Sequence, residues 1–226
     1  MLKNSKINNT APGKILVFGL PRTGTTVLQL QLSQLFELNN LSEVYTGDNI
    51  GIVKDIYSWT ADQSQCIVKL LTTNLNAEIN GVDFDRLISC GGFDLVVIPV
   101  GKNLTDTCIS LYYAEQVVNQ YHYYTNDQVA QQLFYMDLNF VTDIFNKEYQ
   151  AFVDSLQYLD THQIRYKTIN YNDYVQNIQQ EIDGVQFCIQ SMRNLPMIYS
   201  NLDYTALCQN YQEVDNLINE ITRTLC

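Results

Sequence analysis

The sequence predicts an α/β fold in which a parallel sheet is flanked by helices. Short apolar runs, typical of strands buried on both faces, occur at residues 15–19 (ILVFG), 66–71 (CIVKLL) and 93–98 (FDLVVI). A fourth run, at residues 164–169 (IRYKTI), alternates as a half-covered strand does. Helical segments separate these runs, and strands that alternate with helices favour right-handed crossovers within one parallel sheet.

Three segments carry apolar residues at helical spacing. Residues 25–38 follow the first strand directly, residues 127–159 predict one long helix or two, and residues 204–224 predict a final helix. The chain shows neither internal repeats nor a linker-like stretch. We therefore expect a single domain over residues 14–226, preceded by a disordered leader at residues 1–13.

The composition indicates a globular protein with an acidic surface. The 226 residues include 46% hydrophobic and 16% charged residues, with a formal net charge of −11. This charge argues against a nucleic-acid partner and means that an anion site has to be built locally. Six scattered cysteines without a CxxC pair, and only two histidines, predict no metal site. With no signal core and no run near the roughly 18 apolar residues of a membrane span, we expect a soluble cytoplasmic protein without membrane contact.

The turn after the first strand, GLPRTGTT at residues 19–26, favours anion binding. Gly19 and Gly24 allow a tight turn and a close approach of the backbone to a ligand. Thr25 and Thr26 then begin a helix, whose first N–H groups point outward with partial positive charge. An arginine and three threonines share this turn, so we expect the loop to bind a phosphate-like anion.

The same loop departs from the Walker A pattern. That pattern needs a lysine directly after its second glycine, whereas Gly24 is followed by Thr25 and the only cation in the loop is Arg22. Walker enzymes also need an acid at the end of a neighbouring strand to hold magnesium. CIVKLL carries Lys69 internally and ends without an acid, and FDLVVI is followed by Pro99. An ordinary kinase or NTPase is therefore disfavoured.

Two motifs resemble those of sulfotransferases that use 3′-phosphoadenosine 5′-phosphosulfate (PAPS). The family's phosphosulfate loop reads P-[KR]-[ST]-G-T-[ST], with its basic residue ahead of the glycine, as Arg22 is here. The family's 3′-phosphate motif, RNPxDxxxS, resembles KNLTDTCIS, which supplies Lys102, Asn103, Asp106 and Ser110 at the matching offsets. A weaker match, INYNDYV at residues 169–175, resembles the family's Y-E-D-L stretch.

The resemblance implies a three-layer P-loop-like fold with the cofactor at the carboxyl ends of the strands. It assigns the 3′-phosphate to Lys102 and Ser110. Lys102 replaces the family's arginine and binds phosphate as a point charge instead of a fork, which implies weaker cofactor binding. The loop residues that it assigns to the 5′-phosphosulfate are Arg22, Thr23, Gly24, Thr25 and Thr26.

The resemblance also implies a metal-free, in-line sulfuryl transfer to a hydroxyl or amine of a small-molecule or carbohydrate acceptor. Arg22 would stabilise the charge that develops on the bridging oxygen. Some members use a histidine near the third strand, which is absent here, and others use a glutamate about twenty residues past the loop. Glu43, 21 positions after Arg22, is the favoured general base, and His122 is the alternative. Lys69 either contacts the sulfuryl group or is a strand-edge lysine.

The sequence does not identify the acceptor, and it allows two alternative functions. A run of tyrosines after the second motif either lines an acceptor pocket or packs in the core. One alternative is a divergent P-loop kinase that uses Arg22 for the γ-phosphate, and the other is a nucleotide-binding module without catalysis. The tyrosines of the run are Tyr112, Tyr113, Tyr121, Tyr123 and Tyr124.

Overall fold

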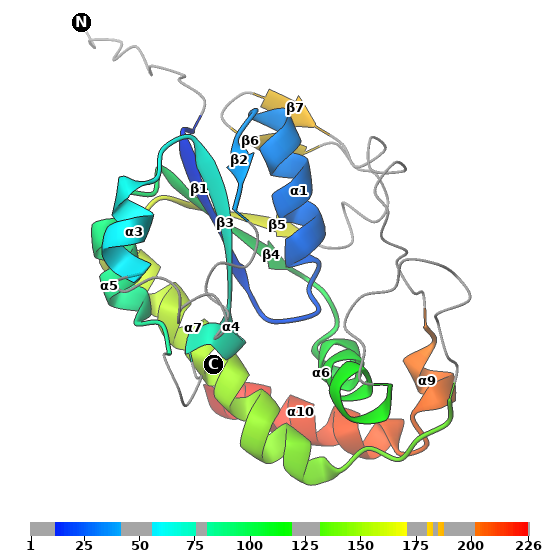
Figure 1. The fold of residues 1–226 in the computed structure, drawn as a ribbon. Helices are drawn as coiled ribbons and strands as arrows, with labels where there is room; N and C mark the ends of the chain where they lie inside the picture. Colours follow the sequence, from blue (N-terminus) through cyan, green and yellow to red (C-terminus); the bar gives the residue numbers. More distant parts are fainter. Residues whose placement is uncertain are drawn as a thin grey trace, which may run out of the picture.

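The structure is a computed structural model in which strands alternate with helices, as predicted (Figure 1). None of the helices in the described part of the chain is both long and apolar enough to cross a lipid bilayer. The residues that the structure describes are 12–41, 56–75, 81–118, 132–170, 180–182, 185–187 and 202–225.

Five parallel strands form the central sheet, in the order β2-β3-β1-β4-β5. This arrangement confirms the predicted α/β class and is consistent with a three-layer P-loop-like fold. The central β1 is buried at every position, and its last residue, Gly19, pairs with Leu71 at the end of β3. The strands of this sheet are β1 (Lys14–Gly19), β2 (Asn39–Asn40), β3 (Cys66–Leu71), β4 (Leu95–Val100) and β5 (Tyr166–Asn170). A separate antiparallel pair consists of β6 (Gln180–Ile182) and β7 (Val185–Phe187).

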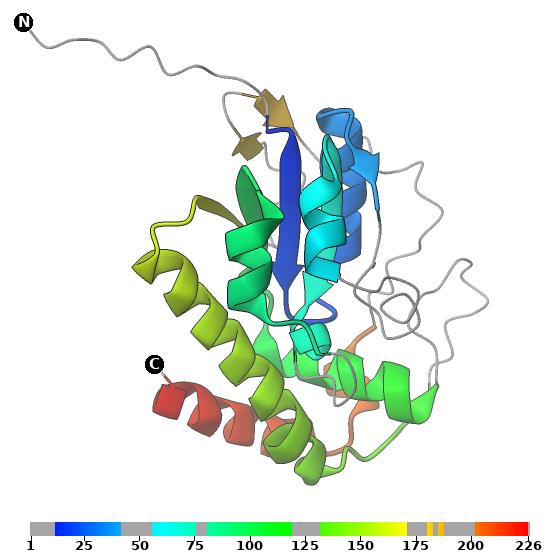
Figure 2. The same ribbon diagram turned by 60° about the vertical axis from the view of Figure 1, so that its left-hand side comes forward.

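Helices cover both faces of the sheet, because successive strand side chains point to opposite faces. On one face, Ile15 and Val17 of β1 pack with Leu28 and Leu32 of α1 (Thr25–Leu35). On the other face, Phe18 stacks on Phe152 of α7 with ring centroids 5.9 Å apart. The helices on this second face, visible in Figure 2, are α3 (Ile56–Asp62), α5 (Phe84–Gly91) and α7 (Asn146–Thr161). The short α4 (Thr72–Leu75) follows β3 and contacts α7.

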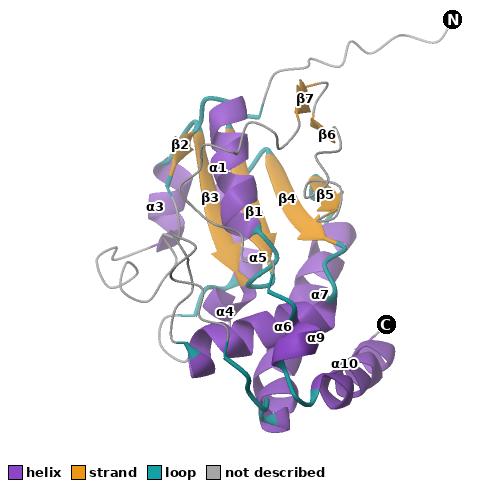
Figure 3. Ribbon diagram, turned by 90° about the vertical axis from the view of Figure 1, so that its right-hand side faces the viewer, coloured by secondary structure: helices purple, strands orange, loops and turns teal. Residues whose placement is uncertain are grey.

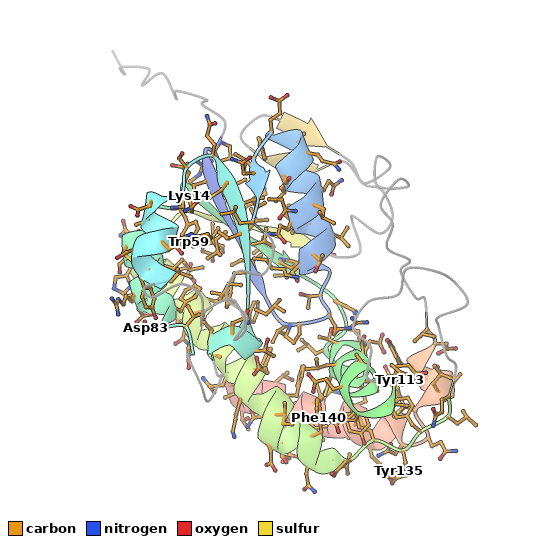
Figure 4. All side chains as sticks on the ribbon, in the orientation of Figure 1. Lys14, Trp59, Asp83, Tyr113, Tyr135 and Phe140 are labelled. Atoms are coloured by element: carbon orange, nitrogen blue, oxygen red, sulfur yellow. The ribbon has the colours of Figure 1, made fainter. Side chains whose placement is uncertain are left out.

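A third apolar core lies beyond the carboxyl ends of the strands, where α6 follows β4 (Figure 3). Tyr113 and Phe140 mark this core in Figure 4, whereas Lys14 and Trp59 lie toward the other end of the strands. We call this group of elements the helical cluster. It contains α6 (Leu104–Tyr112), the π-helices η1 (Tyr113–Val117) and η3 (Phe140–Phe145), α9 (Tyr204–Leu207) and α10 (Tyr211–Leu225).

The expected final helix is interrupted between α9 and α10. Phe134 pairs with Cys208 in an isolated bridge, in which the Phe134 N–H donates to the Leu207 carbonyl (3.1 Å). The Asn210 side chain accepts from the Met136 N–H at 2.9 Å and donates to the Met136 carbonyl at 3.0 Å. These groups bond to a distant part of the chain instead of to the next helical turn, so the helix stops and restarts.

Most of the expected leader lies outside the described residues, which begin at residue 12. The Gly13 and Lys14 N–H groups both donate to Asp94 Oδ2, each at 2.8 Å. Asp94 directly precedes β4, so this carboxylate ties the start of β1 to the start of its neighbour.

Candidate anion-binding site

The strand order brings the two sequence motifs to one crevice. The chain leaves β1 toward β2 on one side of the sheet and leaves β4 toward β5 on the other. Because β1 and β4 are neighbours, their carboxyl ends form a topological switch point, the usual position of ligands in open parallel sheets. GLPRTGTT begins at the last residue of β1, and KNLTDTCIS begins one residue after the end of β4.

The loop after β1 turns sharply through two left-handed residues. Gly24 has φ 85° and ψ 15° and precedes α1, and Arg22 has φ 66°, which is uncommon for a residue other than glycine. Thr23 Oγ1 donates to the Leu20 carbonyl at 2.7 Å, and the Leu28 N–H donates to the Gly24 carbonyl at 3.1 Å. The first turn of α1 contains no acidic residue, so its N-terminal N–H groups suit an anion.

Two hydrogen bonds join the loop to the second motif. The Lys102 Nζ donates to the Arg22 carbonyl at 2.5 Å, and the Arg22 Nε donates to Ser110 Oγ at 3.0 Å. Lys102 and Ser110 are 80 and 88 positions from Arg22 in the chain. The structure therefore brings together the residues expected to bind the two ends of one cofactor.

A third cation reaches the loop from β3. Lys69 is only 2% exposed, and its Nζ donates to Thr26 Oγ1 at 2.5 Å. In the sheet it pairs with Val17, whose side chain faces α1. An ammonium is rarely buried without polar partners, so its position marks the start of α1 as a polar site. Positive charge is thus concentrated at this loop although the chain as a whole is acidic.

The environment of Lys102 opposes its positive charge. The pKa of its ammonium is lowered to about 8, mainly by burial and also by the Arg22 guanidinium, whereas the Asp106 carboxylate acts in the opposite direction. A bound phosphate would add a negative charge beside Lys102 and raise this pKa again. The positive charges of Lys102 and Arg22 repel each other when no anion is present. A bound anion would compensate both charges, so this arrangement favours anion binding.

Tyr204 belongs to the site although its position in the sequence gives no sign of it. Its hydroxyl donates to Ser110 Oγ at 2.9 Å, and the residue is only 8% exposed. Tyr204 begins α9, 94 positions from Ser110, and lies in none of the matched motifs. A single sequence offered no signal for it, because only packing in the helical cluster brings α9 beside α6.

Gly101 also shapes the site, because the chain turns there between β4 and the second motif. It has φ 78°, and a Cβ at this position would lie 2.8 Å from Asn170 Oδ1. Glycine adopts this backbone conformation without strain, whereas a larger residue would be strained and would also displace the Asn170 side chain. The next residue is Lys102, so the turn at Gly101 directs the second motif toward the loop.

The two tyrosines of the predicted run that the structure describes, Tyr112 and Tyr113, lie in the helical cluster. Tyr113 is 1% exposed, and Tyr112 contacts Phe134 and Phe140 with ring centroids 6.0 and 5.1 Å apart. Tyr112 and Tyr113 therefore pack in the apolar core of this cluster. The candidate residues that lie outside the described part of the chain are Glu43, Tyr121, His122, Tyr123 and Tyr124.

Neither comparison with known proteins supplies a function for this chain. No protein-family model matches it, and no curated protein matches it. Within the described residues, no group of three or more His, Cys, Asp or Glu side chains could hold a metal ion. The chemical arrangement around Arg22 is therefore the main guide to function.

Proposed function

We propose that this protein is a sulfotransferase that transfers the sulfuryl group of PAPS to a hydroxyl or amine acceptor. The observation that carries the proposal is the contact of Arg22 Nε with Ser110 Oγ at 3.0 Å, which joins the two motifs that resemble the family. PAPS carries anionic groups at both the 5′ and 3′ positions of its ribose, whereas ATP has no 3′-phosphate. Two adjacent anion sites at one switch point suit a donor of this shape.

The residues of the loop would bind the 5′ end of the donor. The N–H groups at the start of α1 and the hydroxyls of Thr25 and Thr26 would bind its oxygens. Arg22 would stabilise the bridging oxygen as the sulfuryl group leaves and the acceptor oxygen bonds to sulfur. Lys69, whose Nζ lies 2.5 Å from Thr26 Oγ1, would neutralise the sulfuryl oxygens. Lys102 and Ser110 would bind the 3′-phosphate.

The acceptor loses a proton in this reaction, and we propose Glu43 as the general base. Glu43→Gln should lower kcat by about 10²- to 10⁴-fold and leave the affinity for PAPS nearly unchanged. His122→Ala is the comparison variant, and single-turnover kinetics would separate the two effects. An unaffected Glu43→Gln enzyme together with a slow His122→Ala enzyme would assign the base to His122.

Calorimetry with three ligands would test the donor. We expect PAPS and adenosine 3′,5′-bisphosphate to bind without a metal, and EDTA to leave transfer unchanged. Tight binding of ATP–Mg without a response to the bisphosphate would contradict the proposal and favour a divergent P-loop kinase. Binding of the bisphosphate without transfer to any member of a panel of small-molecule and carbohydrate acceptors would favour a module without catalysis.

We also place this activity in the cytoplasm. The cysteines within the described residues are free thiols: Cys66, Cys90, Cys108 and Cys208. A reducing compartment maintains thiols in this state. Fractionation of cells that produce the tagged protein would test the location, and recovery with membranes or in the medium would contradict it.

A further inference from the structure

Ser110 accepts two hydrogen bonds from residues far from it in the sequence. The Arg22 Nε donates to its Oγ at 3.0 Å and the Tyr204 hydroxyl donates at 2.9 Å. Ser110 is 3% exposed and Tyr204 is 8% exposed, so water competes little for these bonds. Arg22 belongs to the loop, Ser110 to α6 and Tyr204 to α9, which means that three separate elements meet at one oxygen atom.

The two hydrogen bonds that Ser110 accepts limit where its own hydroxyl proton can point. A serine oxygen has two lone pairs and one O–H donor, and these two bonds occupy both lone pairs. In the arrangement in which Arg22 and Tyr204 both donate, the Ser110 proton is directed to neither of them. The remaining O–H therefore suits an acceptor that is not part of the protein, and at this crevice an anion is the natural one.

Tyr204 is well suited to stay a hydrogen-bond donor. Burial raises the pKa of its phenol above the ordinary value, and the hydrogen bonds with Ser110 and Arg22 and the Arg22 charge lower it by less. The phenol therefore keeps its proton at neutral pH. The Asp203 side chain caps α9 by accepting from the Thr205 and Ala206 N–H groups at 3.1 and 3.3 Å. Together with the bridge between Phe134 and Cys208, this cap fixes the position of Tyr204.

We propose that Tyr204 is a positioning residue for anion binding, which holds the Ser110 hydroxyl so that its proton points to the bound phosphate. The identity of that phosphate as the 3′-phosphate of PAPS rests on the proposed function. The positioning role itself depends only on the contacts of Arg22, Ser110 and Tyr204. Through Tyr204, the packing of α9 in the helical cluster would then influence how tightly the loop binds its ligand.

A double-mutant cycle on binding of adenosine 3′,5′-bisphosphate tests the proposal. Tyr204→Phe and Ser110→Ala should each raise Kd about fivefold to tenfold, the effect of one hydrogen bond. In the Ser110→Ala background, Tyr204→Phe should add less than about twofold, because the two residues act through the same proton. In transfer assays the KM for PAPS should rise with Kd, and kcat should stay within about twofold.

Tyr211→Phe is the matched control. The Tyr211 hydroxyl also bonds to α6, donating to Asp106 Oδ1 at 3.1 Å, but it does not contact Ser110. We expect this variant to keep Kd within about twofold even if its Tm falls. Equal losses of affinity in Tyr204→Phe and Tyr211→Phe would indicate general loosening of the helical cluster and overturn the proposal. An unchanged Kd in Tyr204→Phe, or fully additive losses in the double variant, would overturn it too.

Titration with inorganic pyrophosphate, followed by amide NMR shifts of the loop, separates the two proposals. A wild-type protein that binds pyrophosphate but not the bisphosphate would refute the sulfotransferase proposal alone. A weaker affinity of Tyr204→Phe for pyrophosphate would still support the positioning role. If wild-type protein binds neither anion, both proposals are wrong.

Discussion

The two sides of the site are built in different ways. The loop side comes from one continuous segment, GLPRTGTT, whose shape follows from two left-handed residues and short-range bonds such as Thr23 Oγ1 to the Leu20 carbonyl. The helical side is assembled from Lys102, Ser110 and Tyr204, which span 102 positions of the chain. Local backbone geometry shapes the loop, but only tertiary packing places the second group of candidate ligands beside it.

The largest effect should come from removing the side chain that the two sides share. Arg22→Ala should lower the transfer rate about 10²- to 10³-fold, as loss of a donor to a developing charge does. Arg22→Gly is the matched variant, because glycine tolerates the φ of 66° at this position. We expect both variants to lose activity equally and the glycine variant to have the higher Tm. Normal turnover in either variant would show that Arg22 has no role in the transfer step.

Matched core deletions would show whether the two sides fold as one unit. Leu32 of α1 and Leu111 of α6 are buried to 0% and 1% exposure in different cores. Each Leu→Ala change should cost about 2–5 kcal/mol of unfolding free energy. For the single domain that we predict, chemical denaturation should show one transition for both variants. Two transitions, with Leu111→Ala shifting only one of them, would identify the helical cluster as a separate folding unit.

Comparing the stability losses of two glycine substitutions would test the role of the turn after β4. Gly101→Ala should cost roughly 1–3 kcal/mol, because its φ is 78° and its new Cβ would lie 2.8 Å from Asn170 Oδ1. Gly92 has a similar φ of 64° but no atom within 4 Å of a new Cβ. Thermal unfolding should therefore show a smaller loss for Gly92→Ala. Equal losses would mean that the Asn170 side chain moves aside for a methyl group at little cost.

The smallest expected effect is a pH dependence of the affinity for the bisphosphate. It would distinguish Lys102 from the arginine found at this position of the motif in PAPS-dependent sulfotransferases. Below about pH 8 Lys102 is already charged when the anion arrives, so binding takes up no proton. Above its pKa of about 8 it must gain a proton on binding, and affinity for the bisphosphate should fall by up to about tenfold per pH unit. Calorimetry of Lys102→Arg should show a flat profile up to pH 9.5. An equally steep profile in that variant would assign the dependence to another group.

The strands and the first loop could be predicted because their signals are local. The run CIVKLL coincides with β3, and ILVFG lies within β1, since apolar runs of this kind mark strands covered on both faces. The two-residue β2 was not predicted, because Asn39 and Asn40 are polar, exposed and too short for a pattern. The break at residues 208–210 was missed because its bonding partners, Phe134 and Met136, are more than seventy positions away.

By itself, the sequence determined that this chain forms a parallel α/β sheet with a glycine-containing turn between its first strand and its first helix. Spacing of apolar residues and the residue types of a turn act over a few neighbours, so they can be read without a structure. The tertiary structure decided that Lys102 bonds to the Arg22 carbonyl and that Tyr204 donates to Ser110. Such contacts depend on strand order and on packing between helices, which bring distant residues within hydrogen-bonding distance but leave no periodic signal along the chain.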